Sequence, residues 1–97
     1  MQPGELLYYF KAIETDNRLR VWHVALLVAI VMTAFQQDRL TGIRVSRSKI
    51  MAKSHVNTLP TYHKYFKELQ ELGYIIYRAS YHPGIRSEID LVIKNFR

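Results

Sequence analysis

Residues 45–75 have the sequence VSRSKIMAKSHVNTLPTYHKYFKELQELGYI, and this stretch decides the fold of the 97-residue chain. It holds two segments of helical character, a short break between them, and a glycine that closes the second segment. It lies largely inside a region without acidic residues, which extends from Asp38 to Glu68. The 29 residues of this acid-free region carry Arg39, Arg44, Arg47, Lys49, Lys53, His55, His63, Lys64 and Lys67.

The first helical segment is predicted over about residues 47–54. Either Ser46 or Ser48 can cap its N-terminus, because a serine hydroxyl accepts a hydrogen bond from a free backbone N–H of the first turn. His55-Val56-Asn57 is then expected to form a tight connection between the two helical segments.

The second helical segment is predicted over about residues 58–72. Thr58 is expected to cap it, Pro60 is tolerated in its first turn, and Gly73 suits its C-terminal end. On a helical wheel, the apolar side chains predict a core-facing surface formed by Leu59, Tyr62, Phe66 and Leu69. The polar side chains predict an outward surface formed by Asn57, Thr61, Lys64 and Glu68, with His63 and Lys67 on its flanks.

Two further helices are expected before this stretch. Helical spacing of apolar residues predicts one helix over about 4–15 and a longer one over about 18–38. Asp16 and Asn17 are good N-cap residues for the longer helix. Thr41-Gly42 is expected to end it.

Strands are expected on both sides of the two helical segments. A very short strand is predicted over 43–45. After Gly73, aromatic and β-branched residues and an alternating pattern predict two strands, at about 74–81 and 87–94. His82-Pro83-Gly84-Ile85 predicts the turn between them, since proline suits the second position and glycine the third.

This order of elements, and three of its segments, resemble the winged helix-turn-helix family of DNA-binding domains. Val45–Met51 resembles the helix that braces the motif, and Val56–Lys64 resembles the turn and the start of the recognition helix. Leu69-Gln70-Glu71-Leu72-Gly73-Tyr74-Ile75 resembles the family's frequent ending that leads into the wing. The resemblance covers about residues 18–94. It implies one α+β, mainly α domain, with residues 1–17 as an additional N-terminal helix.

The resemblance also implies a function, namely sequence-specific binding of double-stranded DNA by the recognition helix and the hairpin wing. Proteins of this kind include small bacterial transcriptional regulators and accessory factors of mobile elements. In a major groove, asparagine can bind adenine and lysine can bind guanine. The expected DNA-binding residues are Arg47, Lys49, Lys53, Asn57, Thr58, Thr61, His63, Lys64, Lys67 and Arg86. For Arg86, an ion pair with Glu88 or Asp90 is an equally open interpretation.

The distribution of charge favours the same partner. The net charge is +6, yet residues 1–42 hold four basic and four acidic residues and are neutral as a group. The whole surplus therefore lies in residues 43–97. A one-signed surface attracts a polyanion, because neutralised phosphates release their condensed counterions.

The apolar run VALLVAIVMTAF, residues 24–35, is too short to cross a bilayer, which takes about 20 apolar residues. It also lacks the context of a signal peptide. We expect no membrane partner, and a central helix buried on most sides. Apolar surface in the N-terminal half predicts a homodimer through residues 1–38. The alternative is that both N-terminal helices only complete the core of a monomer.

Several classes of function are disfavoured by the sequence. The chain has no cysteine, which excludes disulfides, zinc–thiolate fingers and thiol catalysis. Its four histidines are scattered, and it has no glycine-rich phosphate loop, nucleophile elbow or His-Glu-x-x-His motif. We therefore expect a cytoplasmic protein that is not an enzyme and uses no metal, cofactor or small-molecule ligand.

Two other functions remain open. The domain could dock onto another protein, since a fold does not determine a function. It could also bind single-stranded nucleic acid by stacking bases on tyrosines of the C-terminal half. The tyrosines concerned are Tyr62, Tyr65, Tyr74, Tyr77 and Tyr81.

Overall fold

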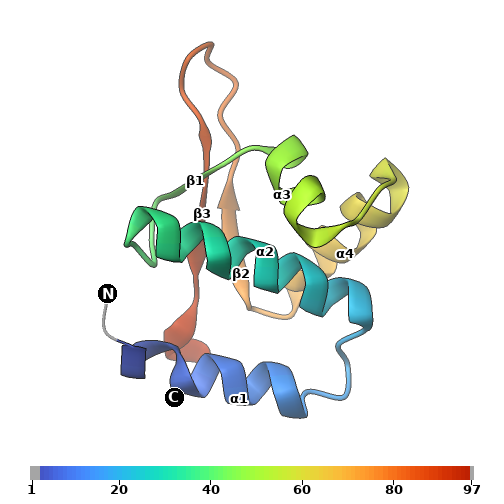
Figure 1. Cartoon of the computed structure of the whole chain (residues 1–97), viewed down its shortest axis with the longest axis vertical. Helices are drawn as coiled ribbons and strands as arrows, with labels where there is room; N and C mark the ends of the chain where they lie inside the picture. The colour runs from blue at the N-terminus through green and yellow to red at the C-terminus, as the bar shows by residue number, and fades with distance from the viewer. Residues whose placement is uncertain (1–2, 97) are drawn as a thin grey trace.

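The computed structural model describes residues 3–96, which form a mainly helical structure with a small three-stranded antiparallel sheet (Figure 1). This confirms the α+β, mainly α class expected from the sequence. Within these residues there are four α-helices. The elements in chain order are η1 (Pro3–Leu6), α1 (Leu7–Thr15), α2 (Val21–Gln37), β1 (Ile43–Val45), α3 (Arg47–Ser54), α4 (Leu59–Glu71), β2 (Ile75–Arg78), β3 (Ser87–Leu91) and η2 (Ile93–Phe96).

Helix α2 crosses the middle of the molecule and carries the centre of the core (Figure 1). It packs against α3, α4 and β1, and Leu26, Leu27 and Ile30 on it are fully buried. The sheet and α4 contribute further large buried side chains, among them Ile89 and Leu69. None of the helices in residues 3–96 is both long and apolar enough to span a bilayer.

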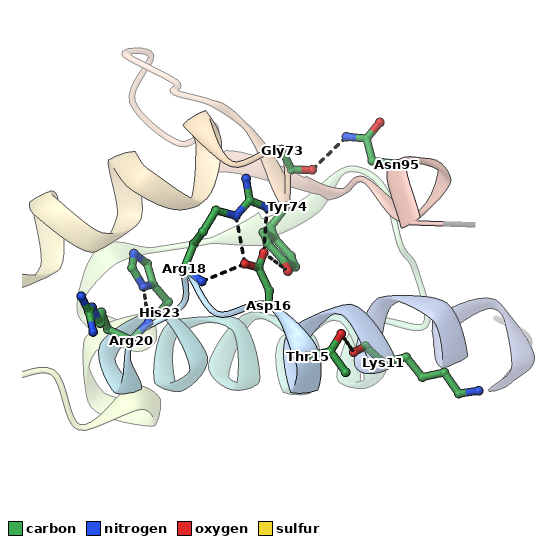
Figure 2. A network of polar contacts seen from close by, with 9 residues as sticks. All are labelled: Lys11, Thr15, Asp16, Arg18, Arg20, His23, Gly73, Tyr74 and Asn95. Carbon is green, nitrogen blue, oxygen red and sulfur yellow. Dashed lines mark hydrogen bonds and ion pairs between the residues drawn. The ribbon is translucent and has the colours of Figure 1, made fainter.

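The start of α2 differs from the prediction. The helix begins at Val21, and neither Asp16 nor Asn17 caps it. The Asp16 carboxylate instead accepts hydrogen bonds from the Arg18 guanidinium at 2.8 and 2.9 Å and from the Tyr74 hydroxyl at 2.8 Å (Figure 2). These bonds occupy the group that was expected to cap the helix. The chain instead makes a turn, in which the Leu19 N–H donates to the Asp16 carbonyl at 3.1 Å, before the extended residue Arg20.

Helix α3 has the predicted bounds, and Ser46 caps it by accepting a hydrogen bond from the Lys49 backbone N–H. His55 closes it in the left-handed conformation, with φ at 61°. Thr58 precedes α4 as expected, but its hydroxyl donates to the Thr61 hydroxyl and does not cap the backbone.

The sheet has the order β1-β3-β2, with β3 in the middle. Ile43 and Tyr77 both pair with Ile89, so the short first strand and the hairpin form one sheet. The hairpin turn lies where it was predicted, since the Ile85 N–H donates to the His82 carbonyl at 3.2 Å. The strands are shorter than predicted, since β2 ends at Arg78 and β3 ends at Leu91, shortly before the chain enters η2.

The first helix packs on the end of the sheet through aromatic residues. The Tyr9 hydroxyl donates to the Tyr74 carbonyl at 2.8 Å, and both rings contact Phe96. The Asn95 amide donates to the Gly73 carbonyl at 2.9 Å, which fixes η2 beside the start of β2 (Figure 2). Burial raises the pKa of Tyr9, so its phenol remains neutral and available to donate.

Candidate nucleic-acid interface

Two basic grooves flank the start of α3. The first, here called the α2–α3 groove, has a volume of about 430 Å³ and lies between the C-terminal half of α2, β1 and α3. Its polar lining comes mainly from the cationic residues Arg39, Arg44, Lys49, Lys53 and Arg86. The second, the α3–α4 groove, has a volume of about 360 Å³. It is lined by Arg47, Tyr62, His63, Phe66, Lys67, Gln70 and Tyr77.

Lys53 is held in place inside the α2–α3 groove. Its Nζ atom donates to Gln36 Oε1 at 2.8 Å and to Thr33 Oγ1 at 3.1 Å. The Thr33 hydroxyl in turn donates to the Ala29 carbonyl at 2.9 Å. An ammonium group has three donors, so one N–H of Lys53 remains for an anion. Both acceptors, the Thr33 hydroxyl and the Gln36 amide oxygen, are neutral, so they orient the ammonium group of Lys53 without cancelling its charge.

The edge of the same groove is fixed by Gln37. Its amide accepts from the Arg44 N–H at 2.9 Å and donates to the Arg44 carbonyl at 2.8 Å. Both backbone groups of an edge strand are thereby satisfied by one side chain, which protects β1 from pairing with another chain. Arg44 lies opposite Glu88 in the sheet, but the Glu88 carboxylate is bonded to Arg78.

The α3–α4 groove has an aromatic floor and basic walls. The rings of Tyr62 and Phe66 stack at 5.1 Å, and Tyr77 meets Phe66 edge-on at 5.1 Å. Desolvation raises the pKa of Tyr62, so this floor carries no negative charge at neutral pH. His63 and Lys67 are exposed above it.

The faces of α4 match the prediction at most positions, since Tyr62, Phe66 and Leu69 are buried and the polar side chains of Lys64, His63 and Lys67 are exposed. They differ from it at three positions. Glu68, expected to face outward, lies 2.7 Å from Nε2 of the buried His23. The ring of His23 also meets Tyr65 edge-on at 4.8 Å. Thr61 and Glu68 are half-buried, whereas Lys64 between them is exposed. Leu59, expected in the core, is 45% exposed.

The ten residues expected to bind DNA fall into three groups. Lys49, Lys53 and Arg86 line the α2–α3 groove, and Arg47, His63 and Lys67 line the α3–α4 groove. The remaining four residues lie outside both grooves near the start of α4, and they are Asn57, Thr58, Thr61 and Lys64. Lys64 places its Nζ atom 5.1 Å from the centre of the Tyr65 ring.

Two lining cations were missed in the sequence, namely Arg39 and Arg44. Both belong to the acid-free region, which was the available signal, but they lie outside the helices on which the site was predicted. The sequence left open an ion pair between Arg86 and either Glu88 or Asp90. In the structure both carboxylates pair with Arg78 instead.

The cations of the grooves have no carboxylate partner in the part of the chain that the structure describes. The ion pairs there join Asp16 to Arg18, Glu68 to His23, and Arg78 to two acids of β3. Hydrogen bonds from Arg78 hold the pKa of Asp90 below its ordinary value, which leaves that acid ionised but paired. The positive field of both grooves is therefore not neutralised locally.

Among residues 3–96, no three histidine or acidic side chains lie close enough together to hold a metal ion. The chain matches no protein-family model, no curated protein and no solved structure at a significant level. What the protein does is therefore inferred from this surface itself.

Proposed function

We propose that the protein is a winged helix-turn-helix DNA-binding protein that uses the two basic grooves to bind double-stranded DNA. In this proposal α3, the turn at residues 55–58 and α4 are the helix-turn-helix, and the β2–β3 hairpin is the wing. The observation that carries the proposal is the charge of the two grooves. They adjoin at the start of α3, and all their ionic side chains are cationic.

Helix α4 is the element proposed to enter the major groove. A recognition helix presents base-contacting side chains from its exposed face, near its N-terminal end. On α4 that face carries His63 and Lys67, with Arg47 of α3 beside them in the α3–α4 groove. Lysine can donate to guanine O6 or N7, and histidine offers a donor or an acceptor to a base edge. Lys64 and Asn57 remain at the entrance of the helix as secondary contacts.

The α2–α3 groove is proposed to bind the sugar–phosphate backbone. Its cations come from four different segments, which suits a continuous phosphate strand better than a single base. Lys53 is pre-oriented by Thr33 and Gln36, which lowers the entropy lost when it binds a phosphate. Arg86 extends the same positive surface onto the hairpin.

Two alternatives have less support. A single-strand binder would need a row of exposed rings, yet Tyr62 and Tyr74 are buried, and of the tyrosines on the hairpin only Tyr81 is largely exposed, at 92%. A protein-docking module has no need for two grooves in which every ionic side chain is cationic. We accordingly propose a cytoplasmic regulator or mobile-element accessory factor, without enzymatic activity.

The proposal is tested by fluorescence anisotropy with a labelled duplex and the matching single strand, followed by selection of bound sequences from a random pool. Tighter binding to the duplex and an enriched sequence motif are expected. Binding to neither nucleic acid at low salt would favour docking, and preference for the single strand would favour the tyrosine-based alternative.

A further inference from the structure

Helix α2 has an exposed apolar stripe. Val21, Ala25, Val28, Met32 and Phe35 follow one another at intervals of four and three residues, which places them along one stripe of a helix. This set is called the α2 stripe. Val21 is 71% exposed, Phe35 53%, Val28 50% and Met32 46%. The opposite face of α2 is used by the core, so the stripe has no partner within residues 3–96.

We propose that the α2 stripe binds the same stripe of a second copy of the chain, as an antiparallel helix pair. This inference rests on the packing of α2 alone and does not depend on the proposed function. The spacing of four and three residues is that of a two-helix seam, whose side chains insert between those of the facing helix. One surface serves both copies, as two-fold symmetry requires.

The sizes of the side chains favour the antiparallel arrangement. Val28 is the midpoint of the stripe and would meet its own copy at the two-fold axis. Seven residues on either side, Val21 would then face Phe35 of the partner. Ala25, three residues before the axis, would lie next to the partner's Met32, four residues after it. Small side chains would thus meet large ones, which fills space without voids. A parallel pair would place Ala25 opposite itself and Phe35 opposite itself.

Charge is compatible with a second copy, and the α2 stripe supplies about half of the area that a stable dimer takes from each partner. Residues 1–42 are neutral as a group, and α2 itself has no Asp, Glu, Lys or Arg, so two like-charged chains can approach here. The four half-exposed side chains supply roughly 400 Å², taking about half of the area of a buried large side chain for each. A stable interface takes about 800 Å² per partner. Leu7, Tyr8 and Phe10 of α1, each about half exposed, offer further apolar surface in the same half of the chain.

The test is the mass in solution, measured by size-exclusion chromatography with light scattering at tens of micromolar. The wild-type chain should have twice the mass of one chain. Val28→Glu, which puts two like charges at the axis, should weaken the dimer at least tenfold. Its matched control is Ile85→Glu, on a hairpin residue that is 63% exposed, and this variant should remain dimeric. Circular dichroism checks that both variants fold.

Orientation is tested with a spin label on Val21→Cys, which is possible because the chain has no native cysteine. In the antiparallel pair each label lies opposite the partner's Phe35, fourteen residues from the other label, so the distance between the labels is roughly 21 Å at 1.5 Å per residue. In a parallel pair the two labels face each other, and the distance is about 10 Å. A separation near 10 Å would overturn the orientation. A wild-type monomer would overturn the dimer, and so would a monomer that sediments with anionic phospholipid vesicles. Either result would leave duplex binding to be judged separately.

Discussion

The Glu68 carboxylate, which ends the acid-free region of the sequence, accepts a hydrogen bond from the His23 ring across 2.7 Å. The Arg20 N–H donates to Nδ1 of the same ring at 2.7 Å (Figure 2). Nδ1 is therefore an acceptor, so Nε2 carries the hydrogen and donates it in the hydrogen bond to Glu68. A buried histidine thus joins the start of α2 to the middle of α4.

The first prediction concerns this bond. His23→Ala should lower the free energy of unfolding by about 2–3 kcal/mol, because it leaves a cavity and an unpaired Arg20 N–H. Glu68→Ala should cost about 1 kcal/mol, since the carboxylate is partly exposed. Urea denaturation measures both. Glu71→Ala is the matched control one turn of α4 away and should change little. A His23→Ala variant as stable as the wild type would show that the bond does not fix α4.

The second prediction concerns acid. Hydrogen bonds from the Arg18 guanidinium hold the pKa of Asp16 well below its usual range in the folded chain. The unfolded state therefore binds a proton first, at a pKa of about 3.9. The stability from this pair is fully present above that pH and is lost as the pH falls toward the lowered folded value.

The expected result is a decline in stability between pH 5 and pH 2.5 that becomes smaller in Asp16→Asn. Urea midpoints at the two pH values measure it, and Glu14→Gln, an exposed neighbour on α1, is the control. An unchanged decline in Asp16→Asn would contradict the role given to this carboxylate.

The fold could be predicted best where local signals decide it. Ser46 and the polar break after Ser54 fix α3, and the Pro83-Gly84 pair fixes the hairpin turn. Contacts between residues that are distant in the sequence decide other features, such as the start of α2. Asp16 is bonded to Tyr74, 58 residues away, which delays the start of α2. No periodicity in one segment could indicate that partner.

The charge of the candidate surface could be predicted from the sequence, but not every residue that lines it. The acid-free region located the basic surface, and six of the ten expected residues line the two grooves. The helical wheel of α4 correctly placed Tyr62, Phe66 and Leu69 in the core. It could not include His23, whose hydrogen bond to Glu68 leaves that carboxylate half-buried. Arg39 and Arg44 were missed because the fold, and not the helix pattern, brings them beside Lys49.

The third prediction separates the faces of α4. Lys67→Ala should weaken binding to a selected sequence by about 1–3 kcal/mol, with a smaller loss on random duplex. Lys64→Ala should cost less, because Lys64 lies over the Tyr65 ring outside both grooves. Competition binding with the two duplexes measures the difference. A larger loss for Lys64→Ala would restore the orientation expected from the helical wheel.

The fourth prediction concerns the α2–α3 groove. Lys49→Ala should weaken binding to all duplexes alike and reduce the salt slope by about 1, as expected for a phosphate contact. Lys11→Ala, which removes an exposed lysine of α1, is the matched control. Affinities for selected and random duplexes at several salt concentrations would reveal the effect. Loss of the selected site alone would mean that Lys49 contacts a base.

The central claim is that the two grooves neutralise DNA phosphates, and the most direct test is the affinity of the wild-type chain for duplex DNA between 50 and 200 mM salt. Neutralising about five to seven phosphates predicts a slope of log K against log salt of roughly −4.5 to −6. A slope near zero, or no binding at 50 mM salt, would contradict the account.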